Sequence, residues 1–445
     1  MDTIDDVTKR KWLALYAFLI VDFIQILFIS ILYVDEANPV MVELNFSNLS
    51  VLSSLSLMAG IGFLQLILVY VTAIGMQRSP DLLRLYPDYK APPEWQCRYS
   101  RDQIVNWTHD IAESSGVTVH RIYLMKSPIP NAFTFSLPFM GSLVAVHSNI
   151  LEVIELEEVR AIIAHEVGHI KNRDSIIQIF ARMPSFFIDT IYLYIYVLLG
   201  LGVANALLVY GDIIMAGIRV LILGGFFILS RFMALISNYL MQNASREAEL
   251  LSDYHAAEVI GPTETINGLI RLGQRTEAIS VLISEIRWLE SLNPERSGAV
   301  PQQELLRMIG QYPLDGIDEN NARELAPWVF LTTRLKHMRE VYGVALSDPQ
   351  IKAAVEPAMD FIETKRPDKT ESADGDKTPK TIDWRSVDYD GDRRLSSDEL
   401  KDLLDLLRTN PTKLMFDSEV SMNLMAVSHP DFRRRVLTIA DAFNL

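Results

Sequence analysis

Residues 161–174 read AIIAHEVGHIKNRD, and this stretch is the most informative part of the sequence about the fold and the chemistry of the chain. His165 and His169 are spaced i and i+4, so on a helix both imidazoles project from one face and can reach one metal ion. Glu166 lies beside them, where its carboxylate can handle a water molecule. The stretch therefore predicts a metal site built on a helix.

The residues around the motif also predict a helix. In 156–172, LEEVRAIIAHEVGHIKN, apolar residues recur at helical spacing. Acidic residues open the stretch, and Lys171 and Arg173 follow at its end, which suits the helix dipole. An ordinary amphipathic helix with two histidines would share this spacing. The H-E-x-x-H pattern itself is typical of zinc metalloproteases, and the features below favour that interpretation.

Composition narrows the class of protein. The chain has 445 residues, 49% of them hydrophobic, and a formal net charge of −15, which argues against nucleic acid as a partner. Cys97 is the single cysteine, so an internal disulfide and a paired-cysteine metal site are both excluded. A zinc ion would therefore be held by histidine and carboxylate.

Four apolar stretches reach the roughly 20 residues needed to cross a bilayer. They are residues 12–34, 51–76, 185–210 and 212–237. The first is too long for a signal-peptide core, so it is predicted to be a retained anchor. Asp189, Arg219 and Arg231 fall in the last two stretches and should face a neighbouring helix, water or the catalytic domain. The alternative for this last pair is a buried or interfacial hairpin.

The placement of Lys and Arg predicts the orientation. Lys9, Arg10 and Lys11 precede the first stretch, whereas residues 35–50 contain neither Lys nor Arg. Arg78, Arg84 and Lys90 follow the second stretch. The positive-inside rule then places the N-terminus and the region after residue 77 in the cytoplasm. We expect a multi-pass protein of the cell membrane (plasma or inner membrane) whose catalytic domain is cytoplasmic and whose surroundings include the lipid bilayer.

The expected fold is a mainly α membrane protein with four transmembrane helices and an α+β catalytic domain with a small β-sheet. Residues 101–115 are predicted to be helical, and alternation predicts strands within 117–127 and 142–151. Helical stretches are expected at 245–260, 263–272 and 277–292. The expected segments are an N-terminal transmembrane hairpin (1–77), a first catalytic part (78–184), a second transmembrane hairpin (185–237), a second catalytic part (238–362), a flexible linker (363–380), an EF-hand-like insert (381–410) and a C-terminal catalytic segment (411–445).

A catalytic zinc usually takes three protein ligands, so a third residue is needed. In 245–253, SREAELLSD, Glu249 and Asp253 are spaced i and i+4 on one helix face. One could bind zinc while the other holds the free N–H of a ligand imidazole. Glu247 is an equally good ligand by spacing, and His255 is a weaker rival.

These motifs together resemble peptidase family M48. The H-E-x-x-H stretch, the membrane hairpin and the S-R-x-x-E-x-x-x-D pattern are arranged similarly to the HtpX membrane proteases, over most of residues 10–360 and the last residues of the chain. The resemblance implies a gluzincin-type catalytic domain with one Zn²⁺ per chain. It also implies that Glu249 is the third ligand and Asp253 the partner of a ligand histidine. Ser252 departs from the family pattern, which usually has Ala before the Asp.

The resemblance extends to two shorter motifs. An N-A-F element maps onto Asn131, Ala132 and Phe133, on an edge strand expected to pair with the substrate backbone. A late H-P-x-x-x-x-R element maps onto His429, which is expected to stabilise the oxyanion, and onto Arg435, which is expected to contribute to substrate binding. The alternatives are a turn residue at Asn131 and a structural histidine at His429.

The expected function is that of an integral-membrane zinc-dependent endopeptidase for protein quality control. Glu166 would assist the attack of zinc-bound water on peptide bonds. Polypeptides, mainly misfolded or damaged membrane proteins, would be the substrates, cleaved at the cytoplasmic face. One alternative is a catalytically silent membrane scaffold or calcium-responsive adaptor. A second is a prenyl-protein processing peptidase.

Residues 388–399 follow the pattern of an EF-hand calcium loop. The sixth loop position, where EF-hands place Gly, is Arg393. The alternative is an acidic turn before a helix, so Ca²⁺ is a second, conditional cofactor. The candidate calcium residues are Asp388, Asp390, Asp392, Arg394 and Glu399.

Overall fold

The computed structural model divides the chain into two compact units. The helical unit comprises Thr3–Ser79 and Asp174–Ala248. The α+β unit comprises Met1–Asp2, Pro80–Arg173 and Glu249–Leu445, and it includes the H-E-x-x-H stretch. Within both units the structure describes residues 4–30, 32–34, 42–44, 51–79, 81–87, 98–137, 139–175, 184–291, 306, 309, 317–318, 321–343, 345–364, 381–416 and 429–445.

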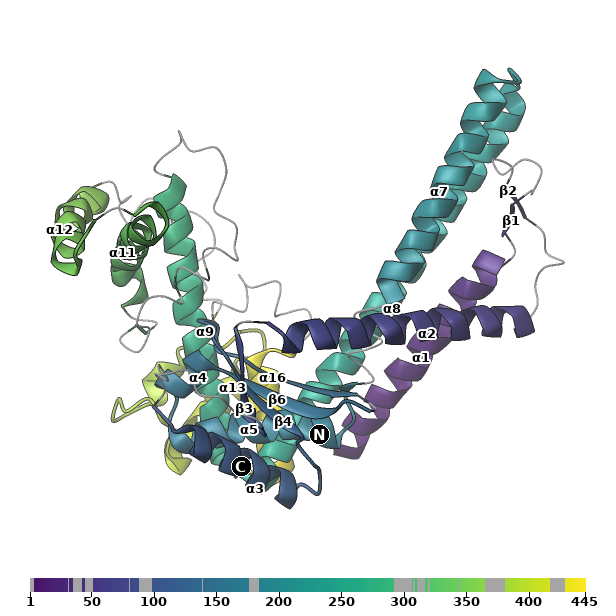
Figure 1. The fold of residues 1–445 in the computed structure, drawn as a ribbon. Helices are drawn as coiled ribbons and strands as arrows, with labels where there is room; N and C mark the ends of the chain where they lie inside the picture. Colours follow the sequence, from purple (N-terminus) through teal and green to yellow (C-terminus); the bar gives the residue numbers. More distant parts are fainter. Residues whose placement is uncertain are drawn as a thin grey trace. The chain divides into compact units, whose positions relative to one another are not determined.

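Long helices dominate the helical unit. They are α1 (Ile4–Ser30), α2 (Val51–Gln77), α7 (Pro184–Leu208) and the first part of α8 (Ile213–Val259). A short antiparallel pair, β1 (Leu32–Val34) and β2 (Val42–Leu44), completes its secondary structure in the described residues. Figure 1 shows α7 and α8 side by side. Gly211 lies in the short link between them, at a φ of 65°. This is the hairpin that the sequence predicts.

Three helices of the described part are long and apolar enough to cross a membrane, judged by length and composition. They contain Leu55–Gln77, Thr190–Leu208 and Ile213–Val259. They correspond to the predicted stretches 51–76, 185–210 and 212–237, and they are compatible with a membrane location. The predicted stretch 12–34 is not among the three, so a fourth span remains a prediction.

Polar side chains inside the helical unit find partners on neighbouring helices. Tyr192 on α7 donates its hydroxyl to Gln25 Oε1 on α1 at 2.9 Å, and Gln25 Nε2 donates to Ser237 Oγ on α8 at 3.1 Å. Arg219 on α8 donates to the carbonyl of Gly202 on α7 at 2.6 Å. The prediction that Arg219 faces a neighbouring helix is therefore confirmed. These bonds join α1, α7 and α8 where apolar packing alone would leave polar groups unsatisfied.

A four-stranded mixed sheet forms one layer of the α+β unit. Its strands are β3 (Leu82–Tyr86), β4 (Arg121–Met125), β5 (Ala132–Leu137) and β6 (Gly141–His147), in the order β3-β4-β6-β5. β4 and β6 are parallel, and the other two pairings are antiparallel. β4 lies inside the predicted stretch 117–127. β6 covers residues 142–147 of the predicted stretch 142–151, whose last four residues are helical, so the prediction is wrong for 148–151. β5 lies at one edge of the sheet.

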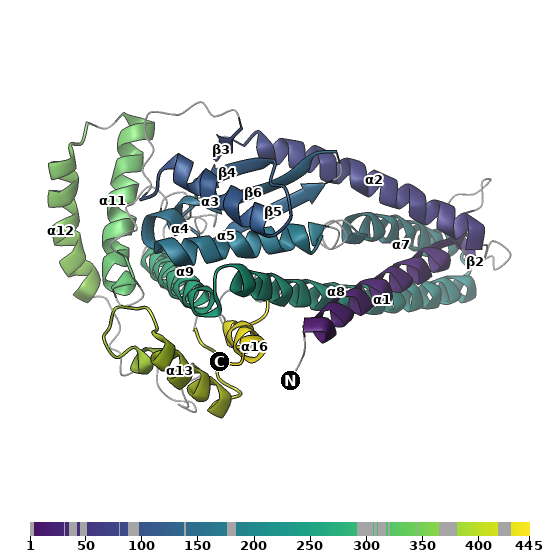
Figure 2. The same ribbon diagram turned by 90° about the horizontal axis from the view of Figure 1, so that it is seen from below.

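Helices α3 (Arg101–Ser114) and α5 (Leu156–Lys171) pack against this sheet, and the short helix α4 (Ser148–Val153) follows β6. Capping boxes define the starts of the two longer helices, at Ser100 for α3 and at Glu155 for α5. In Figure 2 the sheet lies on one side of α5 and α9 lies on the other. The motif helix is thus a central, buried layer, whose core includes Ile104, Ile111, Ile122, Val144, Val146 and Ile163.

The helices after the hairpin are longer than the sequence predicts. α8 continues without a break to Val259, so the stretch 245–260 belongs to the same helix as the apolar segment. α9 (Pro262–Ser291) likewise joins the stretches predicted at 263–272 and 277–292. Gly273 lies inside α9, and a Cβ there would clash with the ring of Phe416. The glycine is therefore needed for close packing and does not end the helix. α11 (Ala322–Tyr342) and α12 (Asp348–Thr364) follow.

The C-terminal elements pack on α9. A 3₁₀ helix, η2 (Trp384–Val387), precedes the acidic loop (residues 388–396), and α13 (Ser397–Thr409) follows this loop. The last helix is α16 (Phe432–Phe443). These elements share one hydrophobic core with α9, which includes Ile266, Ile270, Trp384, Leu395, Leu403, Phe416, Val436 and Ile439. The predicted EF-hand-like segment therefore shares its core with the helix that carries Arg435. Most of the predicted linker 363–380 lies outside the described residues, as does Cys97.

Candidate metal centre

Helix α5 presents the two motif histidines together. The imidazole rings of His165 and His169 lie 4.8 Å apart and nearly perpendicular, at 89°. Their Nε2 atoms are 3.1 Å apart. Two ligand atoms bound at about 2.0 Å to a tetrahedral ion lie about 3.3 Å apart, so this spacing suits zinc.

Helix α8 supplies the third donor. Oε2 of Glu249 lies 3.4 Å from His165 Nε2, and its Oε1 lies 3.5 Å from His169 Nε2. One donor atom from each of the three residues falls within 4.8 Å of the others. Two nitrogens and one carboxylate oxygen are a donor set that zinc accepts, with a fourth position left for water or substrate. The residues present therefore fit a catalytic zinc ion.

The structure separates the two glutamates that spacing alone leaves equal. Glu247, one of the two candidates, lies within the helical unit and accepts hydrogen bonds from Arg10 Nε and Nη2 at 3.2 and 3.1 Å. Glu249 instead faces both motif histidines. The geometry thus selects Glu249, as the family resemblance implies.

The other end of His165 meets a carboxylate. Asp253, one turn beyond Glu249 on α8, places Oδ1 at 2.8 Å from His165 Nδ1. Burial alone would lower the pKa of His165, but the nearby carboxylates of Asp253 and Glu249 raise this pKa to about 10. The surroundings of His165 therefore favour a positive charge, which a divalent cation between the three donors would supply.

Arg435 from α16 binds the far side of Asp253. Its Nε and Nη2 donate to the two carboxylate oxygens at 2.7 and 2.6 Å, and its Nη2 also lies 3.9 Å from Glu249 Oε2. Only 6% of Arg435 is exposed. This placement favours a role in holding Asp253 over direct contact with substrate. The sequence pattern shows the arginine but not its partner.

Glu166 lies buried beside the three donors. Burial raises the pKa of its carboxyl group, while the imidazoles of His169 and His165 oppose that rise. A carboxylate with a raised pKa is a stronger base, which suits proton abstraction from water. Its position and environment are those expected of a general base.

His429 reaches the same group of residues from the segment before α16. Its Nδ1 lies 2.9 Å from Glu249 Oε2, and 43% of its side chain is exposed. It is thus the most exposed member of this group of side chains. The structure brings it to the predicted centre although 260 residues separate it from His169 in the sequence.

The N-A-F element lies where β5 begins. Asn131 accepts the Ala132 N–H through its side-chain Oδ1 at 3.0 Å, and its carbonyl accepts the His147 N–H at 3.0 Å. Ala132 pairs with Val146 of β6, and the ring of Phe133 contacts His147 edge to face. β5 is an edge strand that contacts α5, so the element lies beside the helix that carries the candidate ligands.

The aspartates of the acidic loop accept hydrogen bonds from the N–H groups of the loop's own backbone. Asp388, Asp390 and Asp392 each offer an oxygen within 4.8 Å of the others, and each also accepts a backbone N–H within the loop. Glu399 accepts the N–H groups of Tyr389 and Ser396, and it closes the N-terminal cap of α13. The Arg394 guanidinium lies 3.9 Å from Glu158 of the motif helix. Arg393 adopts a φ of 67°, the conformation that Gly supplies in EF-hands. Calcium binding stays a prediction.

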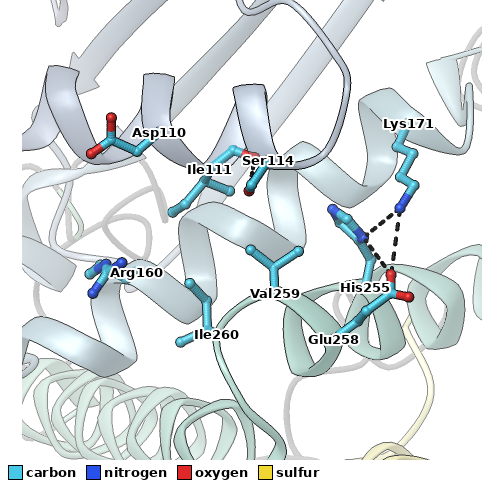
Figure 3. Close-up of a pocket in the computed structure, with 9 residues that line it drawn as sticks. All are labelled: Asp110, Ile111, Ser114, Arg160, Lys171, His255, Glu258, Val259 and Ile260. Atoms are coloured by element: carbon cyan, nitrogen blue, oxygen red, sulfur yellow. Dashed lines mark hydrogen bonds and ion pairs between the residues drawn. The ribbon is translucent and has the colours of Figure 1, made fainter.

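A separate pocket of about 550 Å³ opens next to α3, α5 and the end of α8 (Figure 3). His255, the rival ligand, is at its wall. Its Nε2 contacts Ser115 Oγ at 2.9 Å, and its Nδ1 lies 3.2 Å from Lys171 Nζ and 3.5 Å from Glu258. Both ring nitrogens are therefore engaged away from the donor group. None of the three metal donors lines this pocket. The residues that line it are Asp110, Ile111, Ser114, Arg160, Lys171, His255, Glu258, Val259 and Ile260.

Two histidines and a glutamate from a second helix, with a buried glutamate beside them, form a group that could hold the metal ion of a metallopeptidase. Comparison with known sequences identifies the protein family. The chain belongs to Peptidase family M48, whose family model matches residues 100–441.

Curated relatives are similar over shorter stretches. A Protease HtpX homolog from Persephonella marina is 44% identical over 75 residues, which is 16% of this chain and 26% of that protein. A Protease HtpX homolog from Picrophilus torridus is 29% identical over 121 residues, which is 26% of this chain and 38% of that protein. The matched part thus spans well under two thirds of these relatives. No solved structure matches the chain.

Proposed function

We propose that the chain is an integral-membrane zinc-dependent endopeptidase. The observation that carries this proposal is the convergence of His165, His169 and Glu249 on one point, with buried Glu166 beside them. Membership of a metallopeptidase family supports it. The proposed substrates are polypeptides.

The catalytic roles follow from the positions of the side chains. His165, His169 and Glu249 would hold the zinc ion, which when bound polarises the scissile carbonyl and lowers the pKa of water. Glu166 accepts a proton from the attacking water and later delivers it to the leaving amine. His429, the most exposed member of the group, donates a hydrogen bond to the oxyanion.

Two buried side chains hold the ligand geometry. Asp253 receives the Nδ1 side of His165, which leaves Nε2 directed at the other donors. Arg435 in turn fixes the Asp253 carboxylate with a two-point contact. We assign Arg435 to this positioning role.

Substrate binding is proposed at the edge strand. β5 begins at Ala132, and among the described residues it pairs with one strand, β6, so its other edge would be available to an extended peptide. Main-chain hydrogen bonds would provide affinity without demanding one sequence. This mode suits an enzyme that degrades many unfolded polypeptides.

We further propose that the protein acts in quality control at the cytoplasmic face of the cell membrane, on misfolded or damaged membrane proteins. Three apolar helices, the Lys and Arg distribution and the similarity to HtpX homologs support this. A silent scaffold or calcium-responsive adaptor would have no need of the intact Glu166. A prenyl-protein processing peptidase would have more spans than the sequence shows.

Casein cleavage by the detergent-purified full chain tests the proposal, with Glu166→Gln as the matched variant and zinc content measured on both. We expect about one zinc in each protein and cleavage by the wild type alone. Zinc in both with equal cleavage would refute the role of Glu166. Zinc in both without any cleavage of casein would favour the scaffold.

A further inference from the structure

Ser252 contacts the second motif histidine. It is fully buried on α8, and its Oγ lies 3.0 Å from His169 Nδ1. The next residue, Asp253, lies 2.8 Å from the Nδ1 of His165. Two consecutive residues of one helix therefore meet the outer nitrogens of the two candidate ligands on another.

A close approach of the two helices allows so short a side chain to reach. A Cβ added to Gly168 would lie 3.0 Å from the Cα of Ser252 and 3.2 Å from the Cβ of His255. Helices α5 and α8 are thus in near backbone contact one residue before His169. At this separation a serine hydroxyl spans the gap to the imidazole.

We propose that Ser252 is a positioning residue that orients His169 for zinc, an inference that rests on the proposed function. When Nε2 faces the metal, Nδ1 carries the proton, so the Ser252 hydroxyl oxygen accepts a hydrogen bond from it. That bond holds the ring orientation and the tautomer with a free Nε2 lone pair.

The hydroxyl has an advantage over a second carboxylate at this point. Glu166, Glu249 and Asp253 are already buried within the same group of side chains. A further buried negative charge would cost free energy through desolvation and repulsion. Ser252 orients His169 without adding charge, so the two ligands have unequal partners: an ionised carboxylate for His165 and a neutral hydroxyl for His169.

A second serine–histidine pair in the α+β unit provides a matched control. Ser115 Oγ lies 2.9 Å from Nε2 of His255, which is not among the three donors. Ser115→Ala and Ser252→Ala thus remove the same kind of contact at similar length. Only Ser252→Ala touches a candidate zinc ligand.

The experiment measures the zinc dissociation constant of the full chain in detergent by competition with a chelator, together with thermal unfolding of the zinc-free proteins. We expect Ser252→Ala to raise the dissociation constant by about 10-fold or more, the usual effect of removing a ligand's outer partner. Ser115→Ala should change it by less than about twofold, and Ser252→Thr, which keeps the acceptor oxygen, by less than about threefold.

The outcomes separate the two proposals. A wild type that binds no zinc contradicts the proposed function itself. A wild type that binds zinc, with unchanged affinity in Ser252→Ala, overturns the role of Ser252 alone. Equal weakening in Ser115→Ala, or a loss in Ser252→Thr as large as in Ser252→Ala, also overturns it. If Ser252→Ala does not fold, the affinity of Ser252→Thr decides.

Discussion

Arg435 and Asp253 form a buried two-point ion pair, with hydrogen bonds of 2.7 and 2.6 Å. The pair connects the last helix of the chain to the residue that meets His165. The C-terminal segment therefore belongs to the candidate metal centre, although it follows the motif helix by more than half the length of the chain.

Removal of this arginine should be strongly destabilising. Arg435→Gln leaves the Asp253 carboxylate buried without its partner, a change that typically costs about 3–5 kcal/mol in the free energy of unfolding. Urea unfolding in detergent measures the loss, and zinc content should fall as well. Arg434→Gln, one position earlier on α16, is the control. Equal effects of the two substitutions would show that the ion pair has no special importance.

Stability should depend on pH through Glu158. Burial raises the pKa of this carboxyl group on α5, against the opposing effect of Arg271 and Arg394. The folded protein then holds the proton more tightly than the unfolded chain, so the contribution to stability is present below about pH 4.3 and is lost as the pH rises to the raised pKa.

Glu158→Gln has no group to ionise at this position, so the variant should not lose stability there as the pH rises. We expect its melting temperature to exceed that of the wild type by an amount that increases from pH 4 upward and then levels off. Thermal unfolding across pH 4–8 checks this, with Glu157→Gln on the solvent side of the same helix as control for one lost negative charge. A difference that stays constant with pH would contradict the prediction.

Gly168 should not tolerate a side chain. Gly168→Ala introduces a Cβ 3.0 Å from the Cα of Ser252, so α5 and α8 must separate. Overpacking of this kind costs about 1–3 kcal/mol, and zinc affinity should fall because both ligand helices move. Gly224→Ala on α8, where a Cβ meets nothing within 4 Å, serves as the control in the same unfolding and zinc-binding assays. Wild-type behaviour of Gly168→Ala would contradict the proposed close packing.

Zinc should stabilise the folded chain. The buried carboxylates of Glu166, Glu249 and Asp253 repel one another, and a divalent cation offsets that repulsion. At 100 times the dissociation constant, zinc should add about 2.7 kcal/mol to the free energy of unfolding. Removal of zinc by a chelator should lower the melting temperature, and added zinc should restore it. No shift in either direction would count against a zinc site.

Local sequence signals predicted the motif helix closely. The predicted 156–172 matches α5 at Leu156–Lys171, because acidic residues, apolar spacing and basic residues all agree over one stretch. The predicted helix at 101–115 matches α3 at Arg101–Ser114, where Ser100 and Asp102 mark the start of the helix. β3 was not predicted: it has only five residues, with Arg84 in its centre, and its pairing with β4 defines it.

Long-range contacts account for what sequence could not supply. The distinction between Glu247 and Glu249 depends on Arg10, and the position of Arg435 depends on Asp253. The continuity of α8 was also missed, because its pattern changes from apolar to charged within one helix. Spacing and the family resemblance together therefore named the candidate residues, but tertiary contacts were needed to assign their partners.

His165, His169 and Glu249 are proposed to hold one zinc ion together. The most direct test is the zinc content of the purified full chain carrying Glu249→Gln, compared with Glu247→Gln. We predict about one zinc per chain in the wild type and in Glu247→Gln, and a large loss of zinc in Glu249→Gln. Retention of zinc by Glu249→Gln, or its loss in Glu247→Gln alone, would contradict the account.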